Sequence, residues 1–512
     1  MNLGTSARRW TTAAAATALL AGLAGATAPV APAVSPAAPA FTPKLTYYTC
    51  PPKAQPAGVQ CARLTVPLDW QTPTDGRTTK IDVRVMRSKE GGGGFTFNPG
   101  GPGGSGIESF PAIYSLLPDE VVSRFDFVGW DPRGVGKSGP ALEGCSLPTL
   151  YPPETGPVDW QKFWTDSFDQ IGSANAACAA ANPDAAPYLG TWQVIRDLDA
   201  LRAALGYSTW NYWGMSYGTR IGNAYARTFP NRLRATILDG SLPAAESIYR
   251  LGMSFPANLQ VTAELYPALA APESARKVRI VQNYLNGSVL ALPDGTQFTR
   301  WDWAEQYRTL LVAQSQYPVI RAYIDALYTG ITTKTAAERR KALKVVASIS
   351  EVIREVIKES EATGPVLALV NCSDMHDRPT VEQLVTASQM VDLTYDVTLP
   401  VFMGNAAACA GLDPQGLSPA VPTGPSTVAL KNPPVFVLTT GDAATPWVWG
   451  RNLANTFTRS SVITYDSTQH VAYLQTPSDC VNDRVTDYLL TLERPQRIQG
   501  CAYVPGGAIP AR

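Results

Sequence analysis

The chain has 512 residues, of which 45% are hydrophobic, and its 42 basic side chains balance its 42 acidic ones. A neutral chain of this length can bury a large core, and its charge gives no reason to expect a nucleic acid or an anionic surface as a partner. The sequence holds two histidines and no Cys-x-x-Cys or His-Glu-x-x-His pattern, so no zinc site, other metal or cofactor is expected.

Residues 1–40 predict an export signal followed by a linker. Arg8 and Arg9 form the basic start, and the Ala/Leu-rich run 12–24 forms the apolar part. This run is too short to span a bilayer comfortably. Without the segment the chain keeps 40 basic and 42 acidic side chains. We therefore expect a secreted protein with no membrane anchor.

The first strands of the mature chain are expected at 62–68 and 80–86, where apolar and polar side chains alternate. A third strand, at 94–97, leads into the glycine-rich segment 98–106, Asn-Pro-Gly-Gly-Pro-Gly-Gly-Ser-Gly. This segment lacks the spacing of a dinucleotide fingerprint and the lysine of a phosphate-binding loop. Beside a nucleophilic serine, such glycines let backbone N–H groups approach an oxyanion.

Residues 124–130 form the next expected strand. The turn after it contains Asp131 and Arg133, which we expect to pair and brace the strand end. The Pro/Ala-rich segment 140–188 indicates a surface excursion. Apolar residues return at helical spacing over 191–205, which predicts a helix.

The motif Gly-Met-Ser-Tyr-Gly at 214–218 follows the aromatic run 208–213 and precedes an amphipathic stretch. Strand, sharp turn and helix in this order are typical of a nucleophile elbow, which exposes the serine hydroxyl. We therefore expect Ser216 to be the nucleophile. The N–H after the nucleophile normally donates to the oxyanion, which assigns Tyr217 to the oxyanion hole.

From about residue 246 to 428 the chain is predicted to be helical, with its clearest helices at 303–327 and 336–359. A helical block between two strands is most simply a cap over the serine. The second helix carries an apolar stripe that we expect to pack in the core rather than bind a partner. The stripe consists of Val345, Ile349, Val352, Ile353, Val356 and Ile357.

Two strands after this block carry candidate catalytic residues. Asp442 directly follows the apolar strand 434–440, and His470 follows the β-branched strand 461–465. A serine needs a histidine base that an acid orients, and such sheets collect their chemistry at strand ends. We therefore expect Ser216, Asp442 and His470 to form a catalytic triad.

Other residues compete for these roles. Asp239 also ends an apolar strand and is the rival acid. His376 is the second histidine and is expected to be a polar loop residue. Asp466 lies close to His470 in sequence and is expected in a turn.

Eight cysteines in an exported chain are expected to be oxidised. Sequence alone does not give their connectivity, but they fall into four neighbouring couples. Each couple would close a local loop and contribute roughly 2–4 kcal/mol. The couples are Cys50 with Cys61, Cys145 with Cys178, Cys372 with Cys409, and Cys480 with Cys501.

Four motifs together resemble the secreted bacterial tripeptidyl aminopeptidases, which are α/β-hydrolases related to proline iminopeptidases. They are segment 98–106, Asp-Pro-Arg-Gly-Val-Gly-Lys-Ser at 131–138, Gly-Met-Ser-Tyr-Gly-Thr at 214–219 and Gly-Asp-Ala-Ala-Thr-Pro at 441–446. The resemblance covers nearly the whole mature chain. It implies an α/β-hydrolase fold with a mostly parallel central sheet, helices on both faces and an inserted helical cap. It also implies a serine exopeptidase that releases short peptides, tripeptides in this family, from free N-termini.

The match to the proline iminopeptidase signature His-Gly-Gly-Pro-Gly further implies Gly101 as the first oxyanion donor. This chain departs from the pattern in two places. Pro99 replaces the histidine of that signature, and Gln469 and Val471 flank His470 where relatives usually have glycines. Esterases share the same motifs, so a carboxylesterase for small esters and a prolyl-type aminopeptidase are alternatives.

The expected organisation has four parts: the export and linker segment 1–40, a first core segment 41–245, the cap 246–428 and a second core segment 429–512.

An aminopeptidase must hold a free ammonium group at a fixed distance from the scissile carbonyl. A carboxylate in a partly closed site would do this. Our candidate is Asp374 in the cap, because the apolar run 366–370 and a bridge between Cys372 and Cys409 would hold it at the cleft.

Overall fold

The chain separates into two units, Met1–Ala40 and Phe41–Arg512. The predicted export signal coincides with the first unit and lies outside the described residues. Among the described residues, no helix is both long and apolar enough to cross a bilayer. The computed structural model describes residues 41–52, 56–244, 246–394, 404–422, 424 and 426–506.

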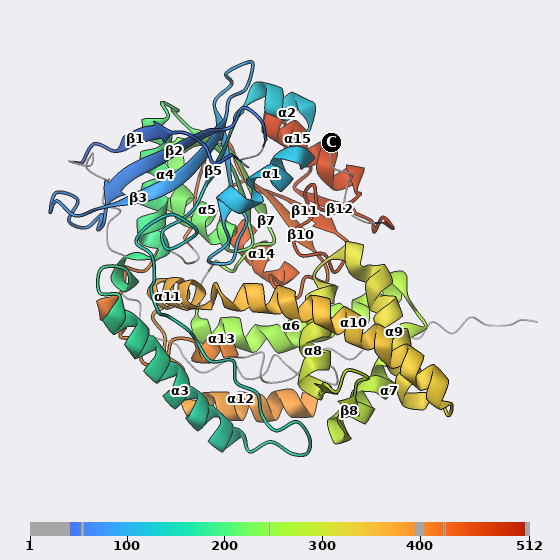
Figure 1. The fold of residues 1–512 in the computed structure, drawn as a ribbon. Helices are drawn as coiled ribbons and strands as arrows, with labels where there is room; N and C mark the ends of the chain where they lie inside the picture. The colour runs from blue at the N-terminus through green and yellow to red at the C-terminus, as the bar shows by residue number, and fades with distance from the viewer. Residues whose placement is uncertain are drawn as a thin grey trace, which may run out of the picture. The chain divides into compact units, whose positions relative to one another are not determined.

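Within its described residues, the second unit is built on a ten-stranded sheet (Figure 1). Strands β1, β2, β3 and β5 pair antiparallel, and every pairing from β5 onward is parallel. The central strands are short aromatic or β-branched runs that are buried throughout, as parallel strands covered on both faces must be. The strands lie in the order β1 (Lys44–Tyr48), β2 (Gln60–Pro67), β3 (Thr78–Met86), β5 (Asp126–Trp130), β4 (Gly94–Asn98), β6 (Trp210–Met215), β7 (Leu233–Asp239), β10 (Val435–Thr439), β11 (Ser461–Tyr465) and β12 (Ile498–Cys501).

Helices cover both faces of this sheet and bury a separate apolar cluster on each. One cluster joins α1 (Gly106–Leu116), α2 (Asp119–Arg124) and α15 (Asp479–Thr491) to the sheet. The other joins α4 (Thr191–Ala204), α5 (Tyr217–Thr228) and α14 (Trp447–Ala454). The predicted fold class, a mostly parallel sheet between two helical layers, is confirmed.

Between β7 and β10 the chain forms a run of helices, which we call the cap (Figure 1). A short hairpin of β8 (Leu290–Ala291) and β9 (Gln297–Phe298) lies within it. The limits 246 and 428 remain a prediction. The cap helices are α6 (Ile248–Ala270), α7 (Ser274–Gly287), α8 (Arg300–Leu311), α9 (Tyr317–Thr332), α10 (Ala336–Glu361), α11 (Gly364–Asp374), α12 (Val381–Thr394) and α13 (Gly404–Ala407).

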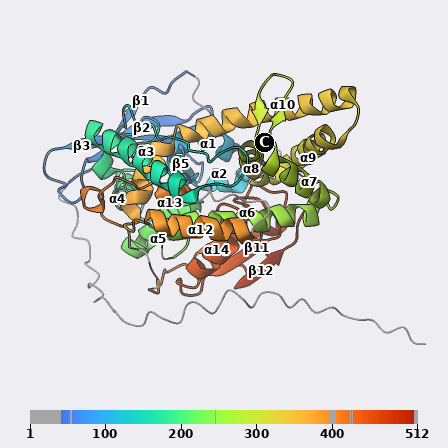
Figure 2. The same ribbon diagram turned by 90° about the horizontal axis from the view of Figure 1, so that it is seen from below.

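The segment expected to be a surface excursion contributes a further helix to this layer. Helix α3 (Trp160–Ala181) packs against α12 (Figure 1 and Figure 2). The indole of Trp164 donates to Ser388 at 2.7 Å and that of Trp160 to Asp392 at 2.6 Å. The run of aromatic residues in α3 is thus explained by packing on the cap.

Two expectations for the cap helices need correction. The helix expected at 303–327 is broken after Leu311, where η3 (Gln314–Gln316) separates α8 from α9. The apolar stripe of α10 is only partly packed. Ile353 is buried and Ile349 and Ile357 are partly buried against the cap helices, whereas Val345, Val352 and Val356 are 40%, 66% and 51% exposed.

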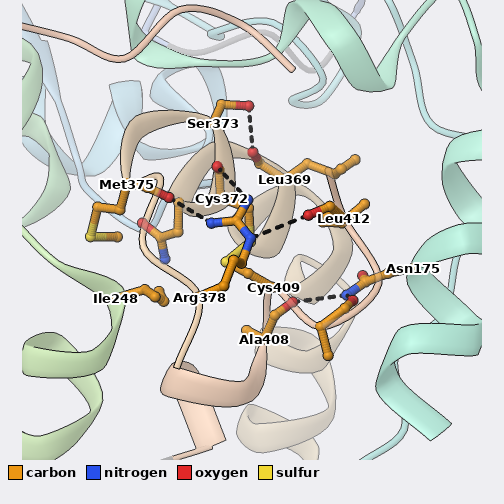
Figure 3. The surroundings of a disulfide bond; sticks show 12 residues. Asn175, Ile248, Leu369, Cys372, Ser373, Met375, Arg378, Ala408, Cys409 and Leu412 are labelled. Carbon is orange, nitrogen blue, oxygen red and sulfur yellow. Dashed lines mark hydrogen bonds between the residues drawn. A yellow bond between two sulfur atoms is a disulfide. The ribbon is translucent and has the colours of Figure 1, made fainter. Parts of the chain in front are cut away.

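All four cysteine couples form disulfides, as the sequence indicated. The bridge between Cys372 and Cys409 joins the end of α11 to the segment after α13 (Figure 3). Around it, the Arg378 guanidinium donates to the carbonyls of Cys372, Met375 and Leu412. Asn175 of α3 donates to the carbonyl of Ala408 at 2.9 Å, so α3 also contributes to this corner.

Candidate active site

Ser216 lies in a sharp turn between β6 and α5. Every residue from Trp210 to Ala226 is buried except Ser216, which is half-buried. Its φ of +53° is costly for a residue with a side chain. The turn is held from both sides, because the Ser216 N–H donates to the Asp239 carbonyl at 2.9 Å and the Ser216 carbonyl accepts from the Thr219 N–H at 2.9 Å. Ser216 is therefore the one partly exposed residue in an otherwise buried strand, turn and helix start.

Close packing explains the glycines around this serine. A Cβ on Gly214 would lie 2.3 Å from the Gly218 carbonyl oxygen, and one on Gly218 would lie 2.7 Å from the Asn98 carbonyl oxygen. A Cβ on Gly100 would lie 2.9 Å from the Ser216 Cβ. Strand, helix and glycine-rich loop thus meet at distances that only glycine permits. The loop lies directly against the serine.

His470 and Asp442 meet at the ends of neighbouring parallel strands. The His470 Nδ1 is 2.8 Å from Oδ2 and 3.0 Å from Oδ1 of Asp442. The Asp442 side chain is fully buried, while that of His470 is 20% exposed. Asp442 also accepts from the N–H groups of Ala444 and Thr445 and from the Thr445 hydroxyl, at 2.8, 2.9 and 2.7 Å. These bonds fix the carboxylate, which in turn orients the imidazole.

The histidine loop is anchored by elements far away in the sequence. The His470 N–H donates to the Val312 carbonyl at 2.8 Å, at the break between α8 and α9. The backbone N–H of Gln314 donates to the Gln469 side chain at 2.8 Å. The Thr439 hydroxyl donates to the Gln469 carbonyl at 2.6 Å. The broken cap helix therefore helps to position the imidazole.

Asp239, the rival acid, contacts the histidine loop rather than the imidazole nitrogen. Its two carboxylate oxygens accept from the N–H groups of Ala472 and Tyr473, each at 3.0 Å. Since its carbonyl accepts from Ser216, this one residue ties the serine turn to the histidine loop. The structure thus places Asp442, not Asp239, on the His470 ring.

Asp239 and His470 both have pKa values that differ from the ordinary values of their side chains. Burial raises the pKa of Asp239 to about 7, although the two N–H donors oppose the shift. Burial lowers the pKa of His470, but the charge and hydrogen bond of Asp442, with the charge of Asp239, outweigh burial and raise it above the usual value. Asp442 thus favours the imidazolium that a general base forms when it takes a proton.

The two predicted oxyanion donors belong to the residue after the serine and to the glycine-rich loop. Tyr217 is the first residue of α5, a position whose N–H has no acceptor within the helix. Gly101 follows Gly100 in the loop against Ser216 and has a φ of +103°. Within the described residues, the backbone N–H of neither Gly101 nor Tyr217 donates to another group. Both N–H groups are thus available to a ligand.

The geometry argues against the prediction that Asp374 binds the substrate ammonium, and we do not carry it forward. The Asp374 side chain is 1% exposed and lies 3.0 Å from the Arg220 guanidinium. It also accepts from the N–H and hydroxyl of Thr191, at 2.9 and 2.5 Å. Arg220 donates in addition to Glu246 at 2.7 Å. Both oxygens of this carboxylate already accept hydrogen bonds and its side chain is shielded from solvent, so it is poorly placed to bind a substrate ammonium.

Other sequence expectations also change. Arg133 does not pair with Asp131 but with Asp197, where its Nε is 2.5 Å and its Nη2 2.8 Å from the carboxylate. Asp131 instead accepts from the Ser105 hydroxyl at 2.7 Å and the Ile107 N–H at 3.0 Å, and so supports the start of α1 beside the glycine-rich loop.

His376, the other histidine, contacts the Ser373 carbonyl at 3.0 Å and lies in a loop as expected.

Sequence reasoning missed two residues that support the histidine. Thr445 could have been found, because an aspartate that accepts from the residues two and three positions later is a common turn pattern. Gln314 carried no such signal. Its side chain bonds Tyr465, Ser467 and Val504 across more than 150 positions.

Comparisons with known proteins agree with this fold. The α/β-hydrolase fold family matches residues 95–351, and the TAP-like protein family matches residues 397–501. Serine protease Hip1 of Mycobacterium tuberculosis is 31% identical over 463 residues, which cover 85% of this chain and 86% of that protein. Tripeptidyl aminopeptidase of Streptomyces lividans is 35% identical over 38% of this chain and 37% of its own. Carboxylesterase B of M. tuberculosis is 27% identical over 86% of both. The chain belongs to the TAP-like group of the α/β-hydrolase family and is a serine hydrolase.

Proposed function

We propose that this enzyme is an exported exopeptidase that releases short peptides, tripeptides in particular, from free N-termini. The observation that carries the proposal is the arrangement of Ser216 and the Asp442–His470 pair at the carboxyl ends of three parallel strands of one sheet, β6, β10 and β11, with β7 between β6 and β10. The peptidase names of two relatives support the substrate class. Four disulfides suit an oxidising compartment, which supports export.

In this proposal His470 removes the proton of the Ser216 hydroxyl as its oxygen attacks the scissile carbonyl. Asp442 holds the proton-bearing Nδ1, which leaves the other ring nitrogen free to act as the base. The N–H groups of Gly101 and Tyr217 stabilise the oxyanion. His470 then protonates the leaving amine, and water releases the peptide from the acyl-enzyme by the same steps.

Chromogenic substrates test the proposal. Mono-, di- and tripeptide anilides would be compared with and without an N-terminal acetyl group. We expect the highest kcat/KM for the uncapped tripeptide, and a loss of at least about tenfold, which corresponds to about 1.4 kcal/mol, on acetylation, because acetylation removes the positive charge that an aminopeptidase recognises. Equal rates for capped and uncapped substrates would contradict an aminopeptidase.

A carboxylesterase is the second candidate, because Carboxylesterase B aligns over most of this chain. The two functions differ in the leaving group. p-Nitrophenyl esters of short acids, run in the same assay, would show higher kcat/KM than every peptide anilide if the enzyme is an esterase. If the peptide anilides are hydrolysed and the uncapped tripeptide is preferred, the peptidase stands.

A further inference from the structure

The catalytic residues lie at the carboxyl ends of the parallel strands, and the opposite edge of the sheet is basic. Four adjacent strands have a basic residue at their amino ends: Arg234 on β7, Lys431 before β10, Arg459 before β11 and Arg497 before β12. A chain whose total charge is balanced thus concentrates positive charge at one edge. Such local fields bind anions even when the net charge is zero.

Part of this edge forms a groove. A cavity of about 460 Å³ is lined by Arg459, Ser460, Ser461, Arg494, Pro495 and Arg497. A second cavity, of about 150 Å³, shares Arg459, Ser460 and Arg497 and adds Arg451 from α14. We call these two cavities the arginine groove. Among the described residues no carboxylate lines either cavity, and Glu493, the acid next to Arg494 in sequence, is outside both.

The arginines of the groove lack acidic partners. Within the described residues, none of the four forms an ion pair with a carboxylate. Arg459, Arg494 and Arg497 are exposed. Like charges gathered without counter-charges repel one another, so a bound anion would relieve an existing cost.

The backbone holds these side chains in a defined frame. Arg459 has a φ of +61°, which is unusual for a residue with a long side chain, and its carbonyl accepts from the Arg494 guanidinium. The Ser461 hydroxyl donates to the Pro495 carbonyl at 2.9 Å, and the Val462 N–H donates to the Arg497 carbonyl at 3.0 Å. The loop from Arg494 to Arg497 is thus fastened to the start of β11.

We propose that the arginine groove binds a diphosphate or longer phosphate chain, free or carried by a larger molecule. Guanidinium groups donate in pairs to phosphate oxygens, and three or four of them match a ligand with several charges. The larger cavity is many times the ~30 Å³ of a water molecule and admits more than one phosphate group. Because the groove lies at the edge opposite Ser216, its occupation leaves hydrolysis unchanged.

Calorimetric titration of the full chain with sodium pyrophosphate and tripolyphosphate tests the proposal. The variant is Arg497→Glu, since Arg497 lines both cavities and, within the described residues, its guanidinium makes no hydrogen bond. We expect it to weaken binding at least about tenfold, because charge-assisted hydrogen bonds are lost and a repulsive charge is added. Arg340→Glu, at an exposed arginine of α10, is the matched control and should bind as the parent does.

A second arm separates the possible sources of the phosphate. Sedimentation with vesicles that contain an isoprenyl diphosphate, against neutral phosphatidylcholine vesicles, reports on lipid headgroups that carry a diphosphate. Binding of soluble polyphosphate or of anionic vesicles that Arg497→Glu abolishes supports the groove, and the tighter of the two identifies the source. No binding in either arm at low ionic strength, or an equal loss in Arg340→Glu, would overturn the proposal. Unchanged circular dichroism and melting temperature exclude misfolding of the variant.

Discussion

The serine and the histidine of this site are held in place by different means. Ser216 is fixed by its own neighbourhood, where the strand before it, the helix after it and one glycine-rich loop meet at distances that exclude any Cβ. His470 lies on a loop that is tied to the cap at Val312, to β7 through Asp239 and to β10 through Thr439. The nucleophile is therefore a property of the core, while the base depends on how cap and core meet.

This difference predicts how substitutions in each half of the site affect activity and stability. A change at the serine should remove chemistry and leave stability intact. A change at the supports of the histidine should reduce activity gradually and lower stability with it. The following substitutions, ordered by expected effect, test whether the two halves separate in this way.

Ser216→Ala should reduce kcat by about 10⁴-fold or more, since loss of a triad member leaves only the catalysis that binding and the oxyanion hole provide. The hydroxyl is half-buried in a turn, so its loss opens no core cavity and the melting temperature should be unchanged. Peptide anilide hydrolysis and thermal melts check both parts. A variant that keeps substantial activity would remove Ser216 from the nucleophile's role.

Asp442→Asn should lower kcat by about 10³ to 10⁴-fold, because the amide no longer holds the required tautomer of His470. The matched substitution, Asp239→Asn, should retain most of the activity, since Asp239 contacts backbone N–H groups and not the ring nitrogen. The reverse ranking in kcat/KM would make Asp239 the catalytic acid.

Gln314→Ala should reduce kcat by about 10- to 100-fold, because loosening the cap shifts the imidazole from its position. It should also cost about 1–3 kcal/mol in the free energy of unfolding, since buried partners lose their hydrogen bonds. Gln306→Ala is the control. It removes a bond to Tyr323 deeper in the cap and should cost similar stability with kcat unchanged. Equal losses of kcat in both variants would show that Gln314 has no specific role in positioning the His470 imidazole.

The smallest expected effect is on pH dependence. The rise of kcat/KM with pH should have its midpoint above the ordinary imidazole value of ~6.5, because the pKa of His470 is raised. Asp239→Asn removes a negative charge that favours the imidazolium, so the midpoint should move to lower pH by a fraction of a unit. A midpoint that stays in place would show that Asp239 acts through its hydrogen bonds alone.

Asp239→Asn should also change how stability depends on pH. The pKa of Asp239 is about 7 in the folded chain, above its unfolded value. The folded state therefore binds more protons, and the contribution of Asp239 to stability falls as pH rises from ~4 to ~7. The free energy of unfolding, measured with denaturant at pH ~4 and ~7, should therefore fall less between these pH values in Asp239→Asn than in the parent.

The sequence predicts the local features of this structure better than its contacts between distant residues. The elbow at Ser216 and the strands before Asp442 and His470 rest on local spacing and can be read from the chain. The cysteines fall into neighbouring couples, but the sequence does not give their connectivity. Other features depend on contacts between residues that are far apart in sequence. They are the pairing of Arg133 with Asp197, the burial of Asp374 against Arg220 and the break between α8 and α9. No local pattern records such contacts. The geometry argues against Asp374 as the ammonium site for this reason, because neither the apolar run 366–370 nor the bridge to Cys409 shows whether its carboxylate faces solvent or Arg220.

Covalent labelling tests the central claim most directly. The enzyme would be treated with a fluorophosphonate, which reacts with activated serines, and the adduct would be located by mass spectrometry of its peptides. We expect one adduct per chain, on Ser216, with loss of peptide hydrolysis in proportion to labelling. An adduct on another serine, or full hydrolysis by a chain labelled at Ser216, would contradict it.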